Sequence, residues 1–238
     1  MNEEPPPEKR RWRKPVAAAE GGGRGEGAPA LTSSPRRVSS RRWIERQLSD
    51  PYVRKAKQAG WRARSAYKLV ELDERFKLIR PGAFVADLGA APGGWSQAAL
   101  ARGAARVVGL DILPVEPLPG AAFLLLDISA PEAAAALIAA LGRKPDLVLS
   151  DMAANTTGHK PTDQIRTGHL AELAAAFALQ SLAPGGAFLT KAFQGGLEAG
   201  LLSELKRAFA AVRHAKPPAS RAESPEIYVV AQGFRGGP

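Results

Sequence analysis

The 238-residue chain contains no cysteine and only three histidines. Without cysteine it can form no disulfide, and it has no thiolate for metal binding or redox chemistry. The histidines, His159, His169 and His214, are not paired at a spacing used by metal ligands, so we expect no metal site. These absences argue against disulfide-stapled secreted domains, zinc modules and thiol enzymes.

Long apolar runs are also missing. The longest unbroken one, residues 133–141, has nine residues, whereas a membrane-spanning helix needs about 20. The amino-terminal residues MNEEPPPEKRRWRKP contain no apolar segment of the kind found in a signal peptide. We therefore expect a cytoplasmic protein without a membrane anchor.

Acidic residues are scarce at the amino-terminal end. Residues 1–68 hold 17 Lys and Arg against 7 Asp and Glu, whereas residues 69–238 hold 16 of each. The whole net charge of +10 therefore arises at one end. Positive charge concentrated beside a neutral body is typical of nucleic-acid binding. The alternative is a basic tail that only improves solubility.

The composition divides the chain into a tail and one domain. Residues 1–40 combine six prolines with basic clusters and few apolar side chains, so we expect them to be disordered. Residues 41–234 suffice for a single domain of catalytic size with one core. Within it, residues 41–80 form a basic helical part that we expect to contact RNA. Within residues 41–80, the sequence predicts a short helix before Pro51 and a second helix that ends at Gly60. It also predicts a third helix with an apolar stripe, formed by Leu69, Leu72, Phe76 and Ile79.

Strand and helix signals alternate through the rest of the domain. The predicted strands are residues 84–88, 106–111, 122–127, 147–151, 187–193 and 227–231. The predicted helices are residues 95–102, 131–141, 163–182 and 198–209. This alternation indicates an α/β fold with a mostly parallel, doubly wound sheet and helices on both faces. Ligands of such sheets bind beyond the carboxyl ends of the strands.

The most informative stretch is DLGAAPGGWSQ, residues 87–97, between a predicted strand and a predicted helix. Its glycines, Gly89, Gly93 and Gly94, let the backbone approach a ligand closely. Their G-x-x-x-G-G spacing differs from the G-x-G-x-x-G of dinucleotide-binding enzymes, which argues against a dehydrogenase. We interpret the stretch as a site for S-adenosylmethionine. The alternative is a glycine-rich turn without a ligand.

Aspartates lie at the ends of four predicted strands. Asp111 comes 22 residues after Gly89, a spacing typical of an acidic residue that accepts hydrogen bonds from a cofactor ribose. Asp127 suits an adenine amino group, and Asp87 suits the ammonium of a methionine moiety. Taken singly, each is equally explained as the solvated end of a strand.

Two further ionisable groups accompany Asp151 near the ends of the later strands. Lys191 lies near the end of one predicted strand, and Glu226 directly precedes the last one. A carboxylate and an ammonium at neighbouring strand ends can meet across a sheet and bracket a nucleophile. The alternative for Lys191 and Glu226 is a purely structural ion pair.

A basic cluster marks the start of the striped helix. It consists of Arg62, Arg64 and Lys68. Cations near the start of a helix oppose its dipole, so an anionic RNA would help to explain them. An ordinary solvated helix face is the alternative.

The motifs RARSAYKL, DLGAAPGGWSQ, SDMAAN, TKAFQG and SRAESPEIYVVA together resemble the RrmJ/FtsJ (RlmE) family. The resemblance covers about residues 41–233 and implies a Rossmann-like, class I S-adenosylmethionine-dependent methyltransferase fold. It implies methylation of the ribose 2′-hydroxyl of a uridine in large-subunit (23S) ribosomal RNA, with the assembling 50S subunit as partner. We expect a monomer.

The resemblance also implies roles for single residues. The family's catalytic tetrad falls on Lys68, Asp151, Lys191 and Glu226, with Lys191 as the proton acceptor. The cofactor contacts of the family fall on Gly93, Trp95, Asp111, Asp127 and Asp151.

Two features of the sequence depart from the family pattern. Ala154 replaces a proline that is usual in the family, and the extension before Arg41 is longer than the family needs.

Other functions fit parts of the sequence. One alternative is a methyltransferase that acts on an exocyclic amine of a base. Such enzymes are similar to one another in a D/N-P-P-Y/F motif, but DMAAN at residues 151–155 has neither proline nor aromatic residue. A non-catalytic RNA-binding factor in ribosome assembly would have no need of the tetrad. A 2′-O-methyltransferase of another RNA is a third alternative.

Overall fold

The computed structural model describes residues 50–153, 159–193 and 199–236. Its helices are α2 (Pro51–Gln58), α3 (Ala66–Phe76), α4 (Gly94–Ala101), α5 (Ala133–Leu141), α6 (Lys160–Ser181) and α7 (Ala199–Ala208). Its strands are β1 (Phe84–Leu88), β2 (Arg106–Asp111), β3 (Ala121–Leu125), β4 (Leu147–Ser150), β5 (Ala187–Phe193), β6 (Phe209–Ala215) and β7 (Glu226–Phe234). The predicted tail, its boundary near Arg41 and the predicted helix before Pro51 lie outside the described residues.

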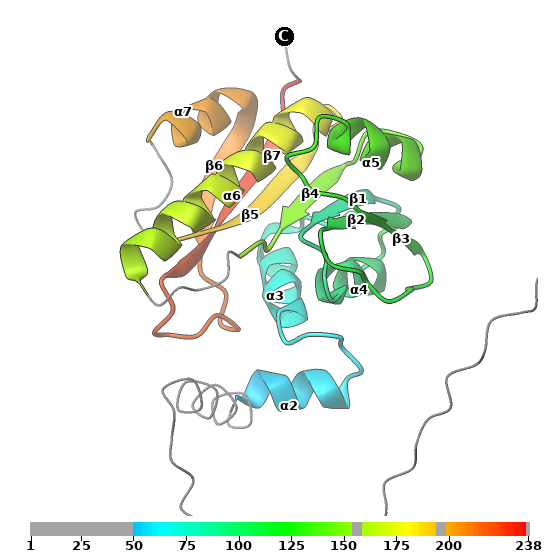
Figure 1. Cartoon of the computed structure of the whole chain (residues 1–238), viewed down its shortest axis with the longest axis vertical. Helices are drawn as coiled ribbons and strands as arrows, with labels where there is room; N and C mark the ends of the chain where they lie inside the picture. The colour runs from blue at the N-terminus through cyan, green and yellow to red at the C-terminus, as the bar shows by residue number, and fades with distance from the viewer. Residues whose placement is uncertain (1–49, 154–158, 194–198, 237–238) are drawn as a thin grey trace, which may run out of the picture. The chain divides into compact units, whose positions relative to one another are not determined.

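The strands form one seven-stranded sheet in the order β3-β2-β1-β4-β5-β7-β6 (Figure 1). Strands β1 to β5 run parallel, and β7 pairs antiparallel with both β5 and β6. The order of the strands reverses between β1 and β4, which is where ligands bind in doubly wound sheets. The predicted α/β fold with a mostly parallel sheet is confirmed.

Strand β6 was not predicted from the sequence. Its segment, FAAVRHA, contains a single β-branched residue, and five of its seven residues are half-buried or more exposed without a clean alternation. The segment directly follows α7, so its apolar start, Phe209, was assigned to the end of the predicted helix. An edge strand is held by backbone pairing with β7 more than by side-chain pattern, and this is why the pattern did not show it.

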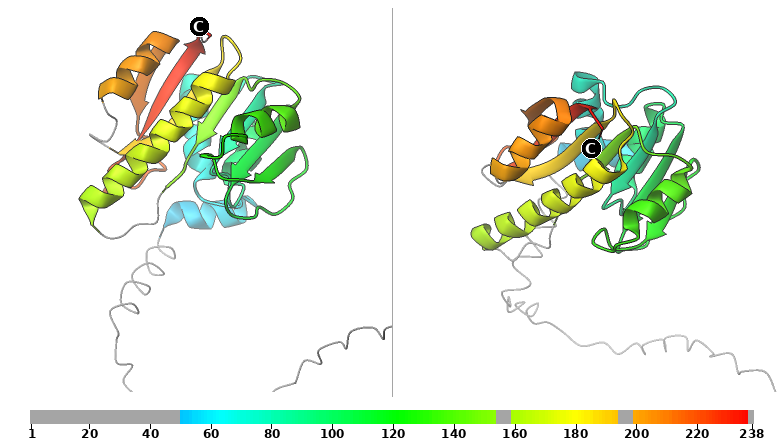
Figure 2. Two further views of the ribbon diagram at one scale, coloured as in Figure 1. Left: turned by 45° about the horizontal axis from the view of Figure 1, so that its top comes forward. Right: turned by 90° about the horizontal axis from the view of Figure 1, so that it is seen from above.

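Helices cover both faces of the sheet, as Figure 2 shows. Helices α5, α6 and α7 pack on one face, around a core that includes Leu137, Phe188 and Phe209. Helices α3 and α4 pack on the other face, around a core that includes Leu69 and Leu147. Strands β1, β4 and β5 are therefore buried on both sides, which explains their continuous apolar sequences.

The amino-terminal helices follow local signals in the sequence. Asp50 caps α2 by accepting a hydrogen bond from the backbone of Tyr52 at 3.0 Å, and Pro51 occupies the first helical position. The predicted apolar stripe is only partly helical, because α3 ends at Phe76 and the backbone turns left-handed at Lys77. Ile79 is buried, but it lies beyond the end of the helix. In the described part of the chain, no helix combines the length and hydropathy required to cross a membrane.

A buried carboxylate, Asp73, joins α3 to α4. Its two oxygens accept hydrogen bonds from the backbone of Ile79 and from Nε of Arg102, each at 2.7 Å. We expect Asp73→Ala to lower the free energy of unfolding by about 3 kcal/mol, because the guanidinium and the N–H both lose their acceptor. Urea denaturation measures the change. The neighbouring Glu74→Ala is the control: its exposed carboxylate lies 3.6 Å from Nη1 of the same Arg102, so the change should stay within about 0.5 kcal/mol. Equal effects for both variants would contradict the role of Asp73.

Candidate active site

The carboxyl edge of the sheet carries most of the ionisable residues predicted from the sequence. Asp87 lies in β1, Asp111 ends β2, Asp151 follows β4, Lys191 lies in β5 and Glu226 begins β7. The antiparallel pairing of β5 and β7 sets Lys191 opposite Tyr228 and Phe193 opposite Glu226. The start of the last strand therefore reaches the edge where the parallel strands end.

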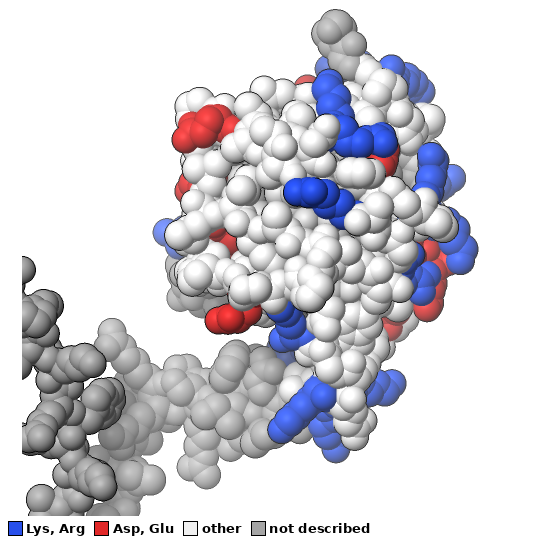
Figure 3. Space-filling view, turned by 90° about the vertical axis from the view of Figure 1, so that its right-hand side faces the viewer, with Lys and Arg blue, Asp and Glu red and all other residues white. Residues whose placement is uncertain are grey.

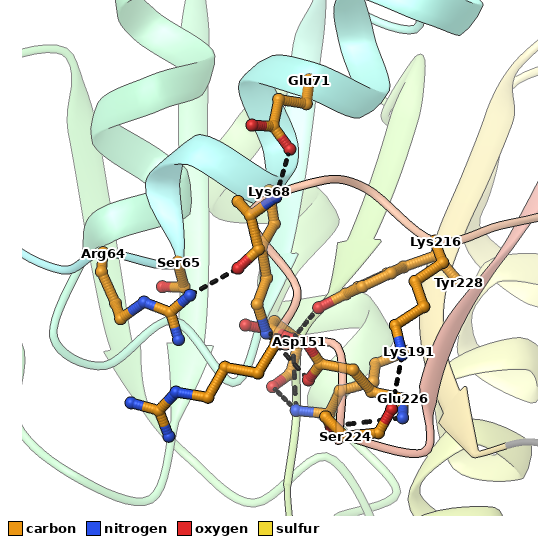
Figure 4. A network of polar contacts seen from close by, with 12 residues as sticks. Arg64, Ser65, Lys68, Glu71, Asp151, Lys191, Lys216, Ser224, Glu226 and Tyr228 are labelled. Atoms are coloured by element: carbon orange, nitrogen blue, oxygen red, sulfur yellow. Dashed lines mark hydrogen bonds and ion pairs between the residues drawn. The ribbon is translucent and has the colours of Figure 1, made fainter. Parts of the chain in front are cut away.

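Two lysines and two carboxylates form adjoining ion pairs at this edge (Figure 4). Nζ of Lys68, on α3, lies 2.8 Å and 2.9 Å from the two carboxylate oxygens of Glu226. Nζ of Lys191 donates to the backbone oxygen of Asp151 at 2.7 Å and lies 3.2 Å from its Oδ1. Both lysine side chains are less than a tenth exposed. The structure thus brings together four residues from four separate segments.

The ionisation of Asp151 follows from its neighbours. Burial by itself raises the pKa of Asp151, but the positive charges of Lys191 and Lys68 and the hydrogen bonds from Tyr228 and Lys191 outweigh it. The pKa of Asp151 is therefore lower than its ordinary value, and the carboxylate stays charged at neutral pH.

Tyr228 is a member of this cluster that sequence reasoning missed. Its hydroxyl donates to Oδ1 of Asp151 at 2.8 Å, its ring lies 5.7 Å from Nζ of Lys68, and the side chain is fully buried. Burial and the negative charges of Asp151 and Glu226 raise the pKa of Tyr228 well above its ordinary value, so the hydroxyl remains a donor. The available signal was its place two residues after Glu226, on the same face of a strand.

The glycine-rich turn lies beside this cluster, because β1 and β4 are neighbours. A side chain at Gly89, whose φ is +75°, would collide with Met152, one residue after Asp151. Burial raises the pKa of Asp87 to about 7, even though the Ser96 hydroxyl donates to its carboxylate at 2.7 Å. Asp87 is thus bonded inside the protein, and its predicted contact with a cofactor ammonium stays a prediction.

The ends of β2 and β3 offer a different surface. Oδ2 of Asp111 accepts from the backbone of Ala91 in the glycine-rich turn at 2.8 Å. Asp127 is exposed two residues beyond β3, where the backbone and hydroxyl of Ser129 both donate to its Oδ1. These bonds lower the pKa of Asp127, and burial opposes them only weakly. Ile112 is two-thirds exposed directly after Asp111. Fixed carboxylates beside exposed apolar surface are the chemistry that an adenosine requires.

Several predicted contact residues instead bond to the protein itself. Trp95 is buried, and its Nε1 donates to the backbone oxygen of Ser65 at 2.9 Å. The guanidinium groups of Arg62 and Arg64, which we expected to contact RNA, donate to backbone oxygens of other loops. Among residues 50–153, 159–193 and 199–236, no three His, Asp or Glu side chains form a group suited to a metal ion.

Removal of one hydroxyl tests the charge balance of the cluster. We expect Tyr228→Phe to lower the free energy of unfolding by about 2 kcal/mol at pH 7, because the charged Asp151 loses a donor. A lowered carboxylate pKa stabilises the fold above the ordinary value of 3.8 and ceases to do so as the pH falls through the folded-state value. The difference between wild type and Tyr228→Phe should therefore shrink below about pH 4. Urea denaturation from pH 3 to pH 8 measures it, and a difference independent of pH would contradict the assignment.

Comparisons with known proteins agree with this geometry. A model of the FtsJ-like methyltransferases matches residues 61–234. A protein of Xanthobacter autotrophicus named ribosomal RNA large subunit methyltransferase E is 57% identical over 206 residues, which cover 84% of this chain and 81% of that one. A protein of the same name from Hyphomonas neptunium is 53% identical over 229 residues, which cover 96% and 98%. A crystal structure of a ribosomal RNA methyltransferase from Plasmodium falciparum superposes with a TM-score of 0.66 at 29% identity, over 74% of this chain and all of that one. The resemblance seen in the motifs is therefore confirmed, and the chain belongs to the FtsJ-like methyltransferase family.

Proposed function

We propose that the protein transfers a methyl group from S-adenosylmethionine to the ribose 2′-hydroxyl of a uridine in large-subunit ribosomal RNA. The observation that carries the proposal is the cluster of Lys68, Asp151, Lys191 and Glu226 beside the glycine-rich turn. The names of the relatives support ribosomal RNA as the substrate. The assembling 50S subunit is the partner we expect, with the protein acting as a monomer in the cytoplasm.

The donor set at the carboxyl edge fits the cofactor. We assign Asp111 to the ribose hydroxyls and Asp127 to the adenine amino group, because hydrogen bonds fix both carboxylates. The exposed Ile112 offers an apolar surface for the base. Gly93 caps the amino end of α4, which begins at Gly94, so the first N–H groups of the helix lie at the same turn. S-adenosylmethionine, when bound, supplies a methyl group on a positively charged sulfur, which needs no further activation by the protein.

The work left to the protein is to orient the hydroxyl and to take its proton. Lys191 is our candidate for both, because Asp151 fixes its ammonium nitrogen through two contacts. As the 2′-oxygen bonds to the methyl carbon, the bond from that carbon to sulfur would break and the hydroxyl proton would pass to Nζ of Lys191, which would first have to release a proton of its own to solvent. Glu226 binds Lys68 through both of its carboxylate oxygens, and we assign Lys68 to contact with the RNA.

Helix α2 provides a surface for the phosphate backbone. Arg54, Lys55 and Lys57 are exposed on it, and its eight residues include no Asp or Glu. Lys and Arg side chains also gather at the lower end of the face in Figure 3, where α2 lies. Such a surface binds polyanions without regard to sequence, so target choice must come from the site itself.

Loss of the proposed base should separate chemistry from binding. We expect Lys191→Ala to reduce methyl transfer to unmodified 50S subunits by about a hundredfold or more, the usual contribution of a general base. Affinity for S-adenosylhomocysteine should persist. Lys206→Ala, which removes an exposed lysine of α7, is the control.

The measurements are a radiolabelled methyl-transfer assay and calorimetric titration of the product cofactor. Substantial turnover in Lys191→Ala would exclude Lys191 as the base. A wild-type protein that binds 50S subunits but transfers no methyl group would favour the non-catalytic assembly factor instead.

The amino-terminal extension can be tested by truncation. Residues 1–40 contain eight Lys and Arg, and each cation that contacts a phosphate steepens the salt dependence of binding by about one logarithmic unit per decade. We expect a chain that begins at Arg41 to bind polyuridine RNA with a flatter dependence on salt and an unchanged cofactor affinity. Equal salt slopes for the two chains would reduce the extension to a solubilising tail.

A further inference from the structure

The connection between α2 and α3 touches both sides of the candidate active site. It comprises residues 59–65 and carries two arginines, Arg62 and Arg64, with one residue between them. Their side chains reach different loops. The loop that follows β2 borders the proposed cofactor site, and the loop between β6 and β7 leads into Glu226.

Arg62 binds the loop that borders the proposed cofactor site. Its Nη1 donates to the backbone oxygen of Glu116 at 2.7 Å and that of Pro92 at 3.4 Å, and its Nη2 donates to that of Pro117 at 2.6 Å. The guanidinium therefore ties the loop after β2 to the glycine-rich turn. A second link uses Gln97, whose side chain accepts from the backbone of Arg62 at 2.9 Å and donates to the backbone of Gly60 at 2.8 Å.

Two glycines of the turn make room for this connection. A Cβ at Gly93 would lie 2.8 Å from Nη1 of Arg62, and a Cβ at Gly94 would lie 3.0 Å from the side chain of Ala63. Both glycines are buried. The turn that we interpreted as open to a ligand is thus closed by protein at these two positions, and Arg62 forms its covering layer.

Arg64 binds the loop that leads into Glu226. Its Nη2 donates to the backbone oxygen of Ala219, and its Nε lies 3.2 Å from Oδ2 of Asp50. The same carboxylate binds Arg221 at 3.1 Å. Glu71 accepts from the backbone nitrogen of Ala219 at 2.7 Å. Both polar groups of the Ala219 backbone are therefore held by side chains from the α3 region, in the loop that ends at Glu226.

We propose that Arg62 and Arg64 are positioning residues, Arg62 for the cofactor loop and Arg64 for the loop that carries Glu226. The proposal rests on the function proposed above and replaces the RNA contact expected from the sequence. Phosphate would have to compete with backbone oxygens that already accept from both arginines. One short connection, continuous with the α3 helix of Lys68, thereby fixes the cofactor pocket and the catalytic carboxylate relative to each other.

The two arginines should affect different steps. Arg62→Gln should weaken S-adenosylhomocysteine binding about tenfold, the loss expected for a charge-assisted hydrogen bond. Its affinity for polyuridine RNA, and the salt slope of that affinity, should not change. Arg62→Lys keeps the charge and should recover part of the cofactor affinity. The control is Arg106→Gln, an exposed arginine at the opposite end of β2.

Arg64→Lys keeps a charge opposite Asp50 but removes the bond to Ala219. It should lower kcat for 50S subunits about tenfold and leave the KM for S-adenosylmethionine unchanged, again the loss expected for one such bond. Calorimetry, filter binding and initial rates give the three readouts for all variants.

The outcomes separate the possibilities. If Arg62→Gln binds the cofactor like wild type but lowers the salt slope by about one unit, while Arg62→Lys keeps the wild-type slope, the arginine contacts phosphate and the proposal fails. If Arg64→Lys raises the KM for the cofactor with kcat intact, the division of roles fails. A wild-type protein without cofactor affinity would overturn the proposed function, and this inference with it.

Discussion

The arrangement of the active site depends on pairing buried charges of opposite sign. An isolated ammonium or carboxylate at the exposure of Lys68 or Lys191 would cost several kcal/mol of solvation. Glu226 and Asp151 offset that cost, and Tyr228 donates to the oxygen of Asp151 that faces Lys191. Each charged group is held by at least one other, so a single neutral replacement disturbs the whole cluster. The same fixation keeps the nitrogen of Lys191, the proposed proton acceptor, in one place.

Sheet topology brings these charges together. Asp151 and Lys191 come from parallel neighbours, β4 and β5, whose carboxyl ends share an edge. Glu226 could not reach that edge from a parallel strand, because it stands at the beginning of β7. The reversed direction of β7 places it there, opposite Phe193. The one reversed strand of the described sheet, next to its β6 edge, therefore completes the ion pairs.

The sequence predicted this edge because its signals are local. Apolar runs gave the strands β1, β2 and β5 with their bounds as the structure has them, and charged residues at the ends of runs indicated the rim. Strand β6 was not predicted, because apolar and polar residues do not alternate in FAAVRHA. Its extended conformation depends on backbone pairing with β7. The place of Tyr228 in the cluster was not predicted, because a tyrosine in an apolar strand is usually a core residue. Its hydroxyl gains meaning only from Asp151, 77 residues away.

Arg62 and Gly93 illustrate the same limit from the opposite direction. A glycine in a turn before a helix suggests space for a ligand, and an arginine before another helix suggests an anionic partner. In the structure the two residues are neighbours, because the absence of a side chain at Gly93 leaves the space that the guanidinium of Arg62 fills. Local pattern identified both residues as unusual but could not pair them across 31 positions of sequence. A functional glycine motif can thus be partly a packing motif, with one face for the ligand and the other for the segment that holds the turn in place.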